Sequence, residues 1–122
     1  MLSVARARFL RITPRKLRVV ADLVRGRTVA QAIVILDHTP KHGSAVLKKI
    51  LKSAQTSAQI KDPAAKPEEL RIATLTVDGG PVLKRWMPRA HGRATPIIKR
   101  TAHAVVELEK ESAPEPKARI AK

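Results

Sequence analysis

The stretch KRWMPRAHGRA, residues 84–94, concentrates the side chains in this sequence that are best suited to hold an anion. It contains four lysines or arginines and one histidine, and it contains no aspartate or glutamate. Lysine and arginine neutralise phosphate charge, and arginine can also hold two oxygens at once. Three interpretations are open: a disordered basic tail, a catalytic loop, or an arm shaped to lie against a nucleic acid.

The basic character extends beyond this stretch. Between Gly79 and Val106 the chain has six lysines or arginines and no acid. They are Lys84, Arg85, Arg89, Arg93, Lys99 and Arg100. A solvated loop is the simplest explanation, but a monomer that exposed such a segment would have little to order it. We therefore expect contact with the phosphates of RNA or DNA.

The N-terminal part of the chain carries a second basic set, most of it before the first acidic residue, Asp22. Alternation along an expected strand puts Arg6 and Arg8 on one face, and helical spacing brings Arg15 near Arg18. The candidate phosphate ligands in this part are Arg6, Arg8, Arg11, Arg15, Lys16, Arg18 and Arg25.

Catalytic and metal-binding patterns are missing from the sequence. His38 and His42 have the i, i+4 spacing of a metal pair, but Pro40 breaks the helix that would align them, and no third ligand is near. The chain has no cysteine, and its serines lie in no local Ser, His and Asp constellation. It also lacks a glycine-rich phosphate loop of the Walker type. We expect a protein that is not an enzyme and uses no cofactor and no metal.

The overall charge points to a polyanionic partner. The 122 residues include 25 Lys+Arg against 10 Asp+Glu, which gives a net charge of +15. No apolar run approaches the roughly 20 residues of a membrane span, and arginines interrupt the N-terminus where a signal peptide would be apolar. We expect a cytoplasmic protein with no membrane partner. Phe9 and Trp86 are the only Phe, Trp or Tyr residues, so a sheet that stacks several bases on aromatic rings is excluded.

Three helices are expected in the first half of the chain. The first, TPRKLRVVADLVRG, begins after Thr13 as N-cap and stops at Gly26. The second, TVAQAIVILDHTP, opens with Thr28 and Gln31 in capping-box spacing. The third, GSAVLKKILKSAQTSAQIK, is long and amphipathic.

Strands are expected at both ends of the chain. Residues 3–12 alternate apolar side chains with arginine, which predicts a half-exposed strand at a sheet edge. LRIATLTVDGG and TAHAVVELEKE also alternate and predict the two strands of one hairpin. If their apolar side chains face the helices together, the pairs are Ala73 with Leu108, Leu75 with Val106, and Val77 with Ala104.

The same register, continued outward, makes KRWMPRAHGRA the end of a long ribbon. It pairs Pro88 with Arg93 and leaves Arg89 to Gly92 as the turn. A two-stranded ribbon alone is marginally stable in water, and its prolines remove ladder donors, so we expect it to need a partner's support.

Three blocks together identify a family. TPRKLRVVADLVRG, AVLKKILKSAQTSAQ and VDGGPVLKRWMPRAHGRATPIIKRTAH resemble the bacterial large-subunit ribosomal protein twenty-two family, and the resemblance covers about residues 3 to 109. It implies an α+β fold with three helices packed on a small three-stranded antiparallel sheet and a long protruding β-hairpin. The expected organisation is one domain over 1–109, with the hairpin arm at about 79–103, and a flexible C-terminal tail over 110–122.

The resemblance also implies a function and partners. Proteins of this family are structural constituents of the large ribosomal subunit that bind its ribosomal RNA, neighbour other ribosomal proteins and reach the nascent polypeptide in the exit tunnel. Changes in the hairpin are associated with macrolide resistance. The tunnel-lining positions implied here are Trp86, Met87, Pro88, Arg89, Ala90, His91, Gly92 and Arg93. Trp86 departs from the shared motif, so cross-strand packing and stacking on a base or an arginine both stay open for it.

Two other functions compete with this one for a small basic protein. A DNA-binding regulator would use the second and third helices as a helix-turn-helix, but Gly43, Ser44 and Ala45 offer few side chains that read bases. A free basic protein acting at membranes or on other proteins would need an exposed apolar helix face, which the pattern does not predict. We therefore expect RNA and not DNA as the partner.

Overall fold

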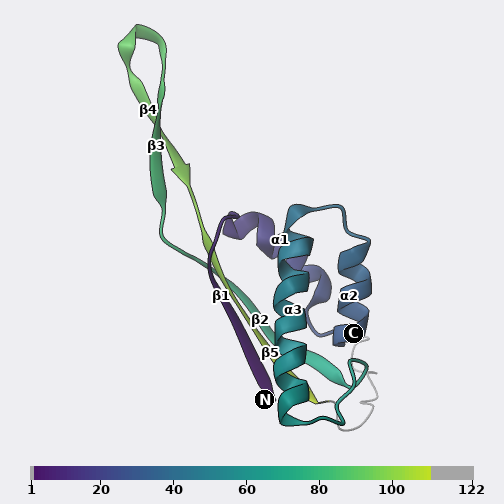
Figure 1. The fold of residues 1–122 in the computed structure, drawn as a ribbon. Helices are drawn as coiled ribbons and strands as arrows, with labels where there is room; N and C mark the ends of the chain where they lie inside the picture. The colour runs from purple at the N-terminus through teal and green to yellow at the C-terminus, as the bar shows by residue number, and fades with distance from the viewer. Residues whose placement is uncertain (1, 111–122) are drawn as a thin grey trace, which may run out of the picture.

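A computed structural model describes residues 2–110 (Figure 1). From residue 111 on, the predicted tail lies outside the described residues. Three helices lie together on one side of a three-stranded antiparallel sheet, and a two-stranded ribbon extends from one end of this body. The α+β class, the three helices and the three-stranded sheet agree with the prediction. No described helix combines the length and apolar character that crossing a lipid bilayer requires.

The first two helices begin where their caps predict. In α1, Pro14–Val24, the Thr13 hydroxyl accepts a hydrogen bond from the Lys16 amide, and Gly26 follows the helix with φ +78. That left-handed φ suits glycine because a side chain there would be strained. α2, Val29–Asp37, starts with the predicted capping box between Thr28 and Gln31. α3 runs over His42–Lys61.

The sheet has the order β1-β5-β2, so β5, Ala102–Lys110, is its central strand. β1, Ser3–Leu10, lies at one edge as predicted, and β2, Leu70–Gly79, lies at the other. The core is aliphatic and forms where the helices pack on this sheet. Its largest fully buried side chains are Leu17, Leu47, Leu51, Leu70, Ile72 and Leu108.

The register between β2 and β5 is partly as predicted. Leu75 pairs with Val106 and Val77 with Ala104, but Leu108 pairs with Ile72 and not with Ala73. Ile72 and Leu75 are three residues apart, so a regular strand could not bury both on one face. A bulge at the exposed Ala73 allows it, and the larger Ile72 side chain gains more from burial than Ala73 would.

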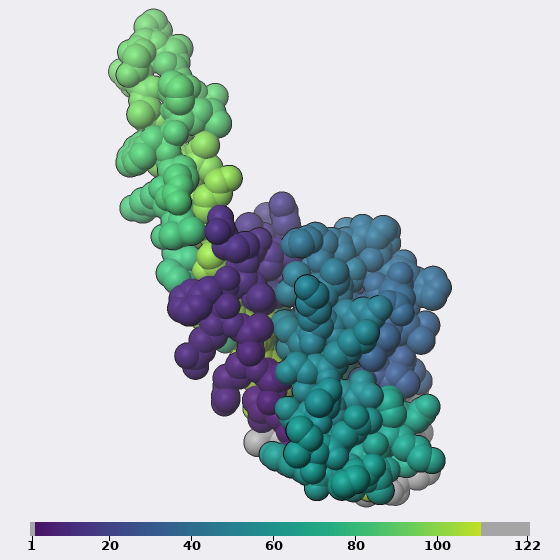
Figure 2. Space-filling view, viewed as in Figure 1, coloured from purple at the N-terminus to yellow at the C-terminus, as the bar shows by residue number. Residues whose placement is uncertain are grey.

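The ribbon consists of β3, Leu83–Pro88, and β4, Ala94–Lys99 (Figures 1 and 2). We call residues 81–100, which include both strands and the turn between them, the arm. Its register differs from the prediction by one residue. Pro88 pairs with Ala94, and the turn extends from Arg89 to Arg93. The shift arises between Gly80 and Leu83, where proline at 81 cannot donate to the ladder and one extra residue is accommodated.

The root of the arm is fixed by a close contact between Gly80 and Thr101. The Gly80 amide donates to the Thr101 carbonyl at 2.9 Å, and the Thr101 hydroxyl donates to the Pro81 carbonyl at 2.6 Å. A Cβ atom on Gly80 would lie 2.5 Å from Thr101 Oγ1 and 3.0 Å from His103 Cε1. Thr101 is buried and already hydrogen-bonded, so it has little freedom to move away.

Replacing Gly80 by alanine therefore tests whether the close contact with Thr101 leaves no room for a side chain at the root of the arm. We expect Gly80→Ala to lower the free energy of unfolding by about 1–3 kcal/mol through overpacking, measured by urea denaturation. Gly79→Ala is the matched control, because a Cβ atom on Gly79 meets nothing within 4 Å. The control should be neutral or slightly stabilising, and equal losses in the two variants would contradict this account of the root.

Candidate nucleic-acid interface

The arm presents its cations to solvent on both faces. Lys84 and Arg85 are neighbours on β3 and so point to opposite faces, and Lys99 lies near the body end of β4. All six predicted arm cations are exposed, and so is every residue from Pro81 to Ala94. No described carboxylate forms an ion pair with any of them. The arm is a basic surface without an opposing charge of its own.

The tip of the arm is a tight turn. The Arg89 amide donates to the Arg93 carbonyl at 2.7 Å, so the two arginines flank the turn. His91 and Gly92 both have left-handed backbone, with φ 62 and φ 69. Such a conformation is strained for histidine. The turn holds the predicted tip residues at the farthest part of the arm from the body (Figure 1).

Trp86 lies on β3 opposite Pro96 and is 64% exposed. The arm therefore covers little of its ring, which leaves most of the indole surface for a partner. The only ring contact among the described residues is elsewhere, where Phe9 meets His103 edge to face with centroids 5.1 Å apart. Phe9 has φ 59 and donates its amide to His103 Nδ1 at 3.1 Å, at the point where β1 bulges beside the arm root.

The N-terminal cations divide into two groups. Arg6, Arg8, Arg11, Arg15 and Lys16 are exposed, and their side chains make no hydrogen bond or ion pair that involves the described residues. Arg6 and Arg8 share one face of β1, as predicted.

Arg18 and Arg25, by contrast, have partners inside the fold. Arg18 Nε donates to the Val77 carbonyl at 3.1 Å, and Arg25 Nε donates to the Leu75 carbonyl at 2.9 Å. Arg25 also pairs with Asp22. These bonds satisfy acceptors on the outer edge of β2, which would otherwise be open to another strand. Sequence spacing could not reveal this role, because it depends on how α1 packs beside β2.

We expect Arg18→Ala to destabilise the body by about 1 kcal/mol, because it leaves the Val77 carbonyl without its donor. Chemical denaturation measures this directly. Arg15→Ala removes another exposed cation from the same helix, one that makes no such bond, so the stability of this variant should match that of the unchanged protein. If the two variants were equally stable, Arg18 would have no role in closing the β2 edge.

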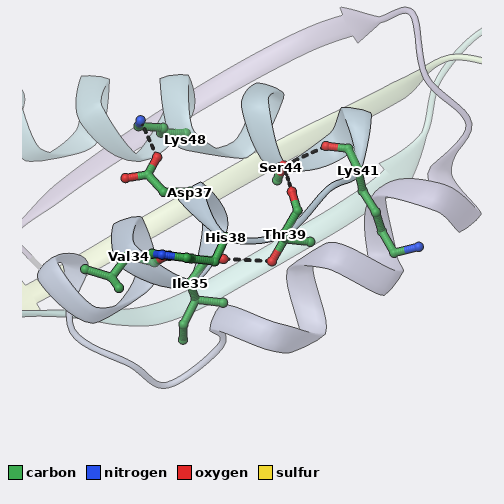
Figure 3. Close-up of polar contacts among 8 residues, drawn as sticks. All are labelled: Val34, Ile35, Asp37, His38, Thr39, Lys41, Ser44 and Lys48. Atoms are coloured by element: carbon green, nitrogen blue, oxygen red, sulfur yellow. Dashed lines mark hydrogen bonds and ion pairs between the residues drawn. The ribbon is translucent and has the colours of Figure 1, made fainter.

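The connection between α2 and α3 is ordered by short-range hydrogen bonds (Figure 3). The Ser44 hydroxyl is within bonding distance of the Thr39 and Lys41 carbonyls, at 2.9 and 2.6 Å, and the Thr39 hydroxyl donates to the Ile35 carbonyl at 2.7 Å. Lys41 is thus fixed by its backbone, while its Nζ points away from this network. Lys41 and His42 were not among the predicted site residues.

Asp37 and Lys48 join the two helices by an ion pair. The hydrogen bond from Lys48 is the main cause that lowers the pKa of the Asp37 carboxyl. The pKa of Asp62 is lowered in the same way, first by Lys110 and then by the amide of Ala64. The pKa of each of these two carboxyls is lower in the folded protein than in the unfolded protein. Each ionised carboxylate therefore stabilises the fold above its unfolded pKa, and this stabilisation is lost as the pH falls through its folded pKa.

Lys48→Met should therefore make the free energy of unfolding depend less on pH between neutral and acid pH. The unchanged protein loses the Asp37 contribution as the pH falls through the depressed pKa, whereas the variant has no such contribution to lose. Denaturation midpoints measured from neutral to acid pH give the comparison. Lys49→Met serves as control, since Lys49 forms no ion pair with the described residues. An unchanged pH slope in Lys48→Met would contradict the assignment.

Comparison with known proteins identifies this arrangement. The sequence profile described as "Ribosomal protein L22p/L17e" matches residues 5–109. The chain belongs to this family. It is also 49% identical over 102 residues to "Large ribosomal subunit protein uL22" of Desulfotalea psychrophila (strain LSv54 / DSM 12343), which covers 84% of this chain and 92% of that protein. A member of the L22p/L17e family is a ribosomal protein and not an enzyme.

The matched range includes the arm and all the predicted phosphate ligands. The predicted sites thus lie within the part of the chain that defines the family. No cluster of three or more potential metal ligands occurs among the described residues.

Proposed function

We propose that this L22p/L17e protein is a structural constituent of the large ribosomal subunit in the cytoplasm, where it binds and organises the ribosomal RNA. The observation that carries the proposal is the arm, whose six cations are exposed on both faces and have no described acidic partner. A two-stranded ribbon with this charge has no core of its own and gains stability from a polyanion around it.

The body supplies a second set of contacts. Arg6, Arg8, Arg11, Arg15 and Lys16 are exposed on β1, the following turn and α1. Binding on the body and on the arm would neutralise phosphates of RNA segments that are distant in sequence. That neutralisation lowers the repulsion between the segments when they are brought together during assembly. Arg18 would add charge to this surface while it closes the edge of β2 with Arg25, whose own charge is offset by Asp22.

The tip of the arm is proposed to line the passage for the nascent polypeptide. Its tight turn and exposed residues from Trp86 to Arg93 suit a protruding element held between RNA segments. Neighbouring ribosomal proteins would meet the body, which we propose as one domain over 1–109. The similarity to a large-subunit protein over most of both chains supports this assignment.

A DNA-binding regulator is disfavoured by the start of α3. A helix-turn-helix reads bases with side chains near the start of its second helix. Here Gly43 and Ser44 are buried, and the Ser44 hydroxyl is engaged by the Thr39 and Lys41 carbonyls. These positions have no free side chain to offer a DNA groove.

Deletion of Leu83 to Arg85 tests whether the arm acts separately from the body. All three residues are exposed and lie outside the buried core, so the body should keep its stability. Cells that carry the deletion should assemble large subunits with an altered response to macrolides, because the tip would be displaced within the tunnel. The measurements are thermal unfolding of the purified variant and growth at graded macrolide concentrations. Unfolding of the body would contradict the claim that the body folds independently of the arm.

A photoreactive side chain tests the location of the tip. With benzoylphenylalanine in place of His91, ribosomes stalled on a nascent chain should yield a crosslink between the protein and that chain. The same substitution at Ile60, which is 77% exposed on α3 far from the arm, is the control and should not crosslink to it. Failure of the His91 position to crosslink while the protein is present in the subunit would refute the tunnel location.

A further inference from the structure

A hollow of about 580 Å³ lies where the root of the arm meets the start of α1 and the start of α3. Figure 1 shows both helices beginning at the end of the body from which the arm leaves. Pockets that bind small organic molecules have volumes of about 300–1,000 Å³, so the hollow is larger than a single phosphate requires. None of the proposed roles so far uses it as a cavity.

The rim of the hollow is cationic. It carries Arg11, Lys16, Lys41, Lys99 and Arg100, and His42 also lines it. None of these side chains forms an ion pair with a described carboxylate. α3 also begins without a side-chain cap and without an acid in its first turn. The positive end of the helix dipole thus adds to the charge of the rim.

The rest of the lining of the hollow is largely apolar. Ile12 and Val19 line it together with Gly43, and Val19 is 51% exposed although it lies on a helix that packs on the core. A cationic rim alone would bind any phosphate. The apolar side chains beside these cations suit the flat face of a nucleobase, which a phosphate does not have. RNA-binding proteins commonly recognise unpaired bases that are turned out of their stack.

A second hollow, of about 400 Å³, lies between β1 and α3 and is also lined by His42. Arg6 and Lys49 are its cations, and its apolar lining includes Leu10 and Val46. The two hollows therefore adjoin at His42 and follow one path from β1 to the arm root. That continuity suits a strand of RNA rather than a free nucleotide.

We propose that the hollow at the arm root receives one unpaired nucleotide of the bound RNA, with its phosphate on the cationic rim and its base against Ile12 and Val19. The proposal rests on the RNA-binding function proposed above and adds the kind of RNA that this part of the surface selects. His42 lies at the boundary of the two hollows, where the strand would pass from one to the other.

Nuclear magnetic resonance on the full chain tests the two parts of the site. Inorganic phosphate and adenosine monophosphate are the probes. We expect both to shift the backbone amides of residues 42 and 43, and only the nucleotide to shift the methyl groups of Ile12 and Val19. If the nucleotide gives the same shifts as phosphate, the base-binding part is overturned. If neither probe shifts these signals, the site itself is overturned.

Binding to two RNA hairpins, one fully paired and one with a single-nucleotide bulge, tests the same site on an RNA chain. We expect the unchanged protein to prefer the bulged hairpin by about tenfold, because only the bulged hairpin can place an unpaired base against Ile12 and Val19. Lys41→Ala and Val19→Asp should abolish the preference. Lys66→Ala removes an exposed lysine that does not line the hollow and should retain it.

The outcomes separate this inference from the broader function. Equal binding of both hairpins by the unchanged protein would overturn the nucleotide site and leave the proposed RNA binding intact. Binding of neither hairpin would count against the RNA binding itself. Circular dichroism of each variant establishes that the body is folded before affinities are compared.

Discussion

Uncompensated positive charge on the arm is the constraint on which the rest of the structure depends. The chain has a net charge of +15, and the acids with described ion pairs all lie in the body. Between Gly79 and Val106 there is none. Water surrounds both faces of the ribbon, so neither a core nor an internal counter-charge stabilises it. The RNA binding proposed above would supply the missing charge, and the chain belongs to a family of ribosomal proteins.

The body anchors the arm through its sheet, and its own core does not depend on the arm. β5 forms the centre of the sheet and continues toward the arm, while Gly80 and Thr101 fix the point of departure. α1 closes the outer edge of β2 with Arg18 and Arg25, which prevents strand addition there. The remaining cations of the N-terminal set are exposed on β1, the following turn and α1. Fold stability and charge for binding are therefore supplied largely by different residues.

Local signals predicted the helices and most of the sheet, because caps and alternation are encoded within a few residues. Thr13, Thr28 and the pairing of Leu75 with Val106 are examples. The errors arose where tertiary packing decides. The bulge at Ala73 follows from burying Ile72 and Leu75 together, and the shift in the arm follows from an extra residue near Pro81. The hollow at the arm root was also missed, because it joins segments far apart in the sequence. An uncapped start of α3 with no acid was its one local signal.

Sedimentation of a cell lysate through a sucrose gradient at moderate salt tests the central claim most directly. The unchanged chain should run with large ribosomal subunits. A variant with glutamine at the six arm cations, Lys84, Arg85, Arg89, Arg93, Lys99 and Arg100, should stay folded and be depleted from that fraction. An unchanged chain that migrates as a free monomer, or a neutralised arm that leaves incorporation intact, would contradict the account.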